Sequence, residues 1–253
     1  MGLRFSLPRA ALEWQVGSGH SVLSLGANLR IVAPLLEADN FVVSVVDNQP
    51  ALSRLVTTYR EQAAAGRLVG IAGKITSLPI APQSFDVVMV NRALRSHVDL
   101  KPAFIEIASA LRDDGWATGS SLERDDSVPW VFRLTQLLRS VDANAMTGDF
   151  TDHHQEALLN SKYFPYHERH DFRLWVSATQ DDLLEMVNSQ PQVAQLDEPD
   201  RKDLVAQVRS LSNDRQLRLP YVLHCWRAYV NQNELTCPIS LDSGAIRFRL
   251  SGH

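Results

Sequence analysis

The chain has 253 residues, of which 45% are hydrophobic and 21% charged, and its formal net charge is −4. This composition is ordinary for a globular protein, and the length suffices to bury a substantial core. The negative balance and the lack of a long Lys/Arg run disfavour nucleic acid as the main partner, because phosphate binding needs a concentrated positive field.

The two cysteines, Cys225 and Cys237, do not have C-x-x-C spacing. A disulfide framework is therefore not expected, and the protein is expected in a reducing compartment. The first nine residues lack the apolar core of a signal peptide, and no stretch approaches the ~20 apolar residues of a membrane span. These features predict a cytoplasmic protein without a membrane partner.

Along the first half of the chain, short apolar runs alternate with helical patterns. The predicted strands are Ser21–Leu25, Phe41–Val46, Leu68–Ala72, Phe85–Asn91 and Trp116–Leu122. The predicted helices are Pro8–Val16, Leu29–Glu37, Pro50–Ala65 and Lys101–Arg112. Near-continuous apolar strands separated by helices are typical of a parallel sheet covered on both faces. The pattern therefore predicts an α/β fold with a doubly wound, Rossmann-like sheet.

The alternation breaks after Glu123. The next segment is mostly helical in pattern, and Thr179 is the expected N-cap of a later helix because Asp181 and Asp182 follow it. Further helix is expected at Pro199–Ser212, and strands at Phe172–Ser177, Tyr221–Val230 and within Ile239–Leu250. We expect one domain over residues 1–253, with seven sheet strands including an antiparallel one. Residues 125–164 are expected to be a helical lobe inserted between strands five and six, above the carboxyl ends of the strands.

Several local motifs follow this order of elements. Val22–Arg30 reads VLSLGANLR, Asp47–Leu52 reads DNQPAL, and Gly73–Val88 reads GKITSLPIAPQSFDVV. The chain resembles class I S-adenosylmethionine-dependent methyltransferases, specifically the type 11 group, over nearly its whole length. That group has V-L-D-L-G-x-G-x-G, D-x-S-x-x-M/L and G-D-A-x-x-L-P-F-x-x-x-S-F-D-x-V at these places. The resemblance implies the seven-stranded methyltransferase fold and methyl transfer from S-adenosylmethionine to a small molecule.

The resemblance also implies where the cofactor binds. The loop after strand one brings backbone close to the cofactor, and an acid after strand two accepts hydrogen bonds from its ribose. The residues carried over are Gly26, Ala27, Asp47, Asn48, Ile75 and Asn91. Ile75 would pack on the adenine. No single catalytic residue is implied, because this chemistry depends mainly on aligning the acceptor with the methyl group.

The chain departs from the family pattern at four positions. Ser24 replaces the acid of strand one, Asn28 and Arg30 stand where glycines are expected, and Lys74 replaces an aspartate. Side chains in the loop would occupy cofactor volume, and Lys74 cannot accept a hydrogen bond from adenine. We therefore expect weak binding, and the cofactor could have been lost.

Three functions remain open at this point. The first is an active methyltransferase, and the second is a catalytically inactive methyltransferase fold that serves as a binding or scaffold module, for which a homodimer is a candidate assembly. The third, a nicotinamide-dependent oxidoreductase, requires a G-x-G-x-x-G that is absent. His97, after strand four, is a candidate general base. No metal site is expected, because His153 and His154 are adjacent on a helix and point in different directions.

Overall fold

The computed structural model describes residues 7–26, 29–90, 93–94, 99–142, 153–211, 216–235, 239–240 and 247–248. Its strands are β1 (Ser21–Leu25), β2 (Phe41–Val46), β3 (Leu68–Ala72), β4 (Phe85–Met89), β5 (Leu111–Arg124), β6 (Tyr166–Thr179), β7 (Gln216–Tyr229), β8 (Ile239–Ser240) and β9 (Arg247–Phe248). Its α-helices are α1 (Arg9–Gln15), α2 (Leu29–Glu37), α3 (Gln49–Thr58), α4 (Arg60–Ala64), α5 (Lys101–Ala110), α6 (Pro129–Arg139), α7 (His153–Leu159), α8 (Gln180–Asn188), α9 (Pro191–Ala194) and α10 (Glu198–Ser210), and a 3-10 turn covers Gln232–Glu234.

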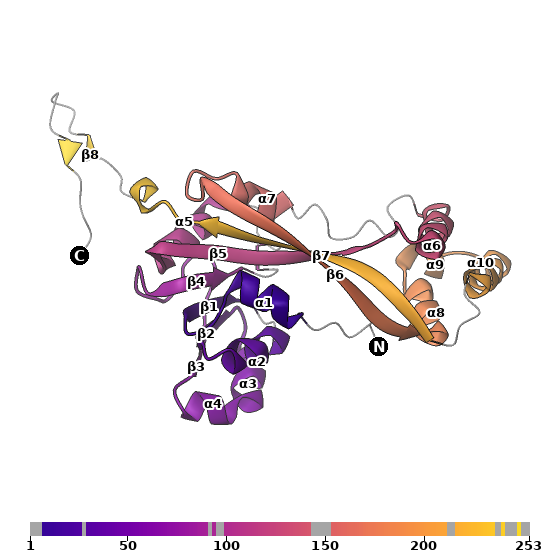
Figure 1. Ribbon diagram of the computed structural model, residues 1–253, viewed down its shortest axis with the longest axis horizontal. Coiled ribbons are helices and arrows are strands. Elements are labelled where there is room, and N and C mark those ends of the chain that lie inside the picture. Colours follow the sequence, from indigo (N-terminus) through magenta and orange to yellow (C-terminus); the bar gives the residue numbers. More distant parts are fainter. Residues whose placement is uncertain are drawn as a thin grey trace. The chain divides into compact units, whose positions relative to one another are not determined.

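The main sheet has seven strands in the order β3-β2-β1-β4-β5-β7-β6 (Figure 1). The first five strands pair in parallel. β7 is antiparallel to β5, because Asp125 N donates to Pro220 O at 3.0 Å while Val230 N donates to Gly115 O at 3.2 Å. The predicted seven-stranded sheet with five parallel strands and a late antiparallel strand is confirmed.

The chain divides into two compact units. Unit 1 includes Ser121–Thr151 and Asp171–His224, and unit 2 includes Leu7–Ser120, Asp152–His170 and Cys225–His253. Of the predicted 125–164 lobe, α6 therefore belongs to unit 1 and α7 to unit 2. The single-domain organisation and the position of the lobe over the strands stay predictions.

Unit 2 holds the parallel strands, with a hydrophobic core on each face of the sheet. Alternate side chains point to opposite faces, so Val22 packs with α1, α2 and α3, whereas its neighbour Leu23 packs with α5 and α7. Both side chains are fully buried. Burial on both faces is the reason that these strands are nearly continuous apolar runs in the sequence.

Unit 1 has a separate core formed by helices. Leu134 and Leu138 of α6 pack with Leu183 of α8 and Val208 of α10, beside the start of β7 at Leu219. The expected N-cap is confirmed: Asp182 N donates to Thr179 Oγ1 at 3.1 Å, and Thr179 N donates back to Asp182 Oδ2 at 2.8 Å. This reciprocal pair is a capping box.

Some predicted boundaries were wrong. β5 begins at Leu111, not at residue 116, because the turn residues before Gly115 form an irregularity within the strand instead of separating it from α5. β6 begins six residues before the predicted start at Phe172. The strand expected within Ile239–Leu250 does not join the main sheet; β8 and β9 pair with each other in a separate two-stranded sheet.

Among the helices that the structure describes, none has the length and apolar character needed to cross a membrane.

Candidate cofactor site

The end of β1 is shaped by Gly26. Its φ of 91° lies in the left-handed region, which glycine adopts readily and side-chain-bearing residues avoid. The Gly26 amide donates to Val45 O at 2.9 Å, which fixes the turn against β2. A methyl group added at Gly26 would meet only Ala93 Cβ, at 3.7 Å, among the described atoms. Among the described atoms, the turn therefore leaves room for a ligand to approach the half-buried backbone of Gly26.

This turn lies where ligands bind in open α/β sheets. The strand order reverses between β1 and β4, so the connections after these two strands lead to opposite sides of the sheet. Crevices at the carboxyl ends of such strands are the usual binding places. Ala93, which follows β4, lies next to Gly26, which follows β1. The residues after both strands therefore meet within unit 2.

Asp47 follows β2, the neighbour of β1, and its carboxylate is exposed. The side-chain amide of Asn48 holds the Asp47 carboxylate in place, because its oxygen and its nitrogen each form a hydrogen bond. Asn48 Oδ1 accepts from Ala51 N at 2.8 Å and so caps α3, while Asn48 Nδ2 donates to Asp47 Oδ1 at 2.7 Å. The cap holds the Asn48 side chain in place, and Asn48 in turn orients the Asp47 carboxylate through Oδ1. The other carboxylate oxygen, Oδ2, forms no hydrogen bond with the described residues.

The segment after β3 places the next predicted residues. Gly73 packs closely, since an added Cβ would lie 2.8 Å from Pro79 Cδ and 3.2 Å from Val45 Cγ1. Lys74 is exposed and forms no ion pair with Asp47. Ile75 is 7% exposed and belongs to the core on the α5 side of the sheet. Ile75 is thus mainly a core residue, and little of its surface remains for an adenine ring.

The remaining departures from the family pattern have separate structural positions. Ser24 is fully buried within β1, paired with Ser44 of β2 and Met89 of β4. Arg30 is exposed in the first turn of α2, and among the described residues it forms no ion pair with Asp47. Residues Ala27, Asn28, Asn91 and His97 lie outside the described residues, so the predictions for them stay predictions.

The acid of the Ser-Phe-Asp motif has a role that the sequence did not reveal. Asp86 Oδ2 accepts from Ser21 N at 2.7 Å, and Oδ1 pairs with Arg112. Asp86 therefore anchors the first residue of β1 and the start of β5, at the amino end of the sheet. In the sequence, Asp86 is an acid at the start of a predicted strand, and nothing in that pattern distinguishes an anchoring role from ligand binding.

A histidine network in unit 1 was also missed. His224 Nδ1 lies 2.8 Å from Asp171 Oδ1, and Nε2 lies 2.9 Å from Glu123 Oε2, so the ring joins three neighbouring strands. Because the carboxylates lie on opposite sides of the ring, they do not converge on one point. Over the residues that the structure covers, no group of three His, Cys, Asp or Glu side chains is arranged to hold a metal ion.

Comparisons with known proteins bear on this site. Residues 23–118 match the family model of a methyltransferase domain of the type 11 group. This range runs from the middle of β1 through Gly26 and Asp47 to Thr118 of β5, and it includes the whole candidate site. No curated protein sequence matches the chain.

Solved methyltransferase structures share the fold. A putative type II methyltransferase from Anaeromyxobacter dehalogenans has 15% identity and a TM-score of 0.68, over 90% of this chain and 98% of its own. A putative methyltransferase from Bacillus halodurans has 12% identity and a TM-score of 0.54, over 88% of this chain and 98% of its own.

A third structure is of a phosphoethanolamine N-methyltransferase from Haemonchus contortus, in complex with phosphomonomethylethanolamine and S-adenosylhomocysteine. It has 15% identity and a TM-score of 0.50, and the match covers 88% of this chain and 52% of that one. At such identities the likeness establishes the fold. Residues 23–118 thus match a methyltransferase domain of the type 11 group, and the chain has the fold of class I S-adenosylmethionine-dependent methyltransferases.

Proposed function

We propose that the protein is an S-adenosylmethionine-dependent methyltransferase that acts on a small molecule. The observation that carries the proposal is that Gly26 and Asp47 follow the ends of two neighbouring strands, β1 and β2. Gly26 has the left-handed backbone and open space that a closely bound ligand needs, and Asp47 presents an oriented, exposed carboxylate. An open turn and an acid in these places are what a ribose-containing cofactor requires.

The residues present fit this cofactor in part. Asp47 would accept hydrogen bonds from the ribose hydroxyls, and Gly26 would allow close approach of backbone to the cofactor. When bound, S-adenosylmethionine supplies an electrophilic methyl group on a positively charged sulfur. The protein's share of the chemistry is then to align the acceptor with that methyl group, since orientation supplies much of the rate in such transfers.

Lys74 argues for weak affinity. Its ammonium group follows the end of β3, the strand beside β2, where the family pattern has an acid. A cation there opposes the positive charge of the cofactor and cannot accept a hydrogen bond from adenine. Its exposed side chain remains free to turn toward solvent, so the effect is a reduction in affinity and not a steric block.

A small-molecule acceptor is supported by two features. The net charge of −4 does not suit a polyanionic acceptor such as nucleic acid. The Haemonchus contortus enzyme, whose fold is similar, was solved with a small phosphorylated amine. Neither feature selects the acceptor itself, and the proposal is limited to this class.

Calorimetric titration tests the proposal. S-adenosylmethionine and S-adenosylhomocysteine would be titrated into the wild type, Asp47→Ala and Asp114→Ala. Asp114 is a matched control because it is also an exposed aspartate of unit 2. We expect weak saturable binding by the wild type and by Asp114→Ala, and at least a tenfold loss in Asp47→Ala, because charge-assisted hydrogen bonds to ribose would be removed.

The same titration distinguishes the alternative function. A catalytically inactive scaffold that has lost its cofactor would bind neither compound. In that case Lys74→Asp supplies a second readout, since restoring the family's acid should raise affinity if the rest of the slot is intact. Absence of binding by both the wild type and Lys74→Asp would refute the enzyme proposal.

A further inference from the structure

We infer that unit 1 has an anion-binding site between α8 and α10, specific for a small molecule that carries a phosphate monoester. This site is separate from the candidate cofactor site, since none of its residues belongs to unit 2. It does not depend on the function proposed above. The argument rests on a hollow, on its charge, and on hydrogen-bond donors that have no partner.

The hollow has a volume of about 270 Å³. Its lining consists of Asn188 from the end of α8 and of Arg201, Lys202, Val205, Ala206 and Arg209 from α10. The residues of α10 follow one another at helical spacing, so they share one face of the helix. The hollow is slightly smaller than the 300–1,000 Å³ that is common for drug-sized ligands, so a small molecule would fill it.

The charged side chains that line the hollow all come from α10. Three lining side chains are cations and none is an acid. Glu198 pairs with Arg201, and its Oε1 lies 3.2 Å from Lys202 Nζ, whereas Arg209 has no carboxylate partner among the described residues. A phosphate monoester carries about −1.5 to −2 charges at neutral pH, so it can interact with several cations at once.

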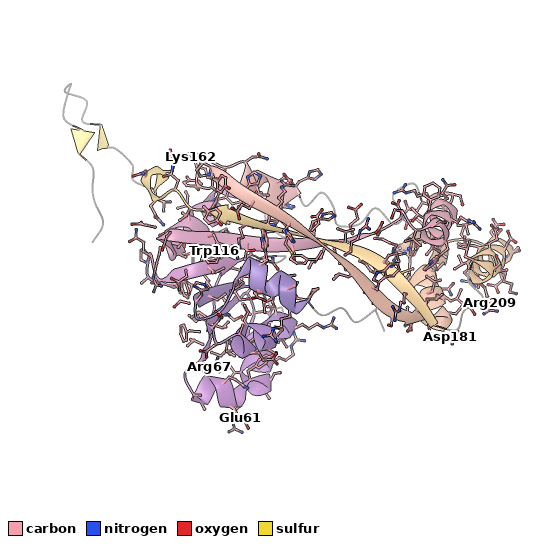
Figure 2. All side chains as sticks on the ribbon, in the orientation of Figure 1. Glu61, Arg67, Trp116, Lys162, Asp181 and Arg209 are labelled. Atoms are coloured by element: carbon pink, nitrogen blue, oxygen red, sulfur yellow. The ribbon has the colours of Figure 1, made fainter. Side chains whose placement is uncertain are left out.

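Two lining groups have donors that the rest of the unit leaves unused. Within the described residues, neither the guanidinium group of Arg209 nor the carboxamide of Asn188 has a hydrogen-bond or ion-pair partner. Arg209, labelled in Figure 2, lies in the last turn of α10, and its backbone oxygen accepts from Gln180 Nε2 at 3.0 Å. A guanidinium fork and an amide donor facing one hollow match the several acceptor oxygens of a phosphate.

The floor of the hollow explains why a phosphate ester is favoured over the free ion. Val205 and Ala206 supply apolar surface between the cations, and Val205 packs against the core of unit 1. An inorganic ion would leave this surface in contact with water. A short carbon chain on the phosphate would cover it, and each buried methylene group would strengthen binding.

Nuclear magnetic resonance titration of the ¹⁵N-labelled full chain tests the site. Inorganic phosphate and glycerol 3-phosphate would be added separately at low ionic strength, because salt screens such interactions. The side-chain amide signals of Asn188 and the Nε–H signal of Arg209 report binding locally. We expect saturable shifts of these signals with both compounds and tighter binding of glycerol 3-phosphate. Chloride at the same ionic strength should cause no saturable shift.

Two variants complete the test. Arg209→Gln removes one charge-assisted contact and should weaken phosphate binding about tenfold or more. Arg218→Gln is the matched control, because Arg218 is an exposed arginine of unit 1 outside the hollow. An unchanged affinity in Arg209→Gln, an equal loss in Arg218→Gln, or an equal response to chloride would each show a diffuse charge effect and overturn the inference.

Discussion

β1 and β6 belong to the same sheet, yet their side chains meet different surroundings. In β1, all four residues after Ser21 are buried, because helices cover both faces of unit 2. In β6, only Ala178 is buried, and Tyr166 and Trp175 are 59% and 57% exposed. Apolar character in a strand thus follows the number of covered faces, and membership of the sheet alone does not require it.

The largest effect that tests this comparison is expected from truncation in β1. Leu23→Ala removes a fully buried side chain of β1 that packs with residues of β2 and α5. The resulting cavity should lower the free energy of unfolding by about 2–5 kcal/mol. Trp175→Ala removes a larger side chain from β6 and should cost about 0.5 kcal/mol or less, because most of that surface is already in water.

Urea unfolding of both variants measures the two costs. The comparison fails if Trp175→Ala is as destabilising as Leu23→Ala. In that event, β6 would have a cover in solution that the described residues do not supply.

A second substitution separates anchoring from ligand binding in unit 2. Asp86→Ala leaves the Ser21 amide and the Arg112 guanidinium without their acceptor, and we expect a loss of about 1–3 kcal/mol in stability. The affinity for S-adenosylmethionine should not change, because Asp86 is at the amino end of the strands. Unfolding and calorimetric titration on the same preparation check both statements. A loss of affinity without a loss of stability would contradict the anchoring role.

A smaller effect is expected in unit 1 from His224→Ala. A neutral imidazole has one N–H group, so only the protonated ring can donate to both Asp171 and Glu123. All three side chains are at least a third exposed, so water screens the interaction and the loss should be only about 0.5–1 kcal/mol. His167→Ala, in the neighbouring strand β6, is the control in urea unfolding. Equal losses in both variants would mean that the network contributes nothing specific.

The smallest effect concerns the start of α8. Hydrogen bonds from the backbone and hydroxyl of Thr179 lower the pKa of Asp182. A carboxyl group whose pKa is lower in the folded state stabilises the fold above its unfolded pKa, and this contribution is lost as the pH falls through the folded value. Asp182→Asn should therefore be less stable than the wild type at pH 7 and equally stable in acid. Thermal unfolding at both pH values measures the difference, and a constant difference would contradict it.

The sequence predicted the parallel part of the fold because its strands are short, apolar and separated by clear turn signals. β1, β2 and β3 begin and end where expected. Prediction was poorer where this physical pattern is absent. The charged first half of β6 has no apolar periodicity, and the Asp113-Asp114-Gly115 turn is typical of a helix end although β5 runs through it.

For the candidate site, the sequence indicated where single residues lie along the chain but not which hydrogen bonds and packing contacts they form. It placed Gly26 and Asp47 after neighbouring strands because turn chemistry and strand ends are local signals. It did not reveal that Asn48 orients Asp47, since one amide serving as both a cap and a donor depends on three-dimensional geometry. Nor did it reveal that Ile75 is largely covered by core neighbours, which come from distant parts of the chain.

The most direct test of the central claim locates the cofactor on the protein. Titration of the ¹⁵N-labelled chain with S-adenosylmethionine would follow the backbone amide of Gly26 and the side-chain amide of Asn48, which donates to Asp47. We expect both signals to shift together and saturably, and to remain unshifted in Asp47→Ala. Saturable shifts elsewhere in the chain, with Gly26 and Asn48 unaffected, would contradict the claim that the ends of β1 and β2 bind the cofactor.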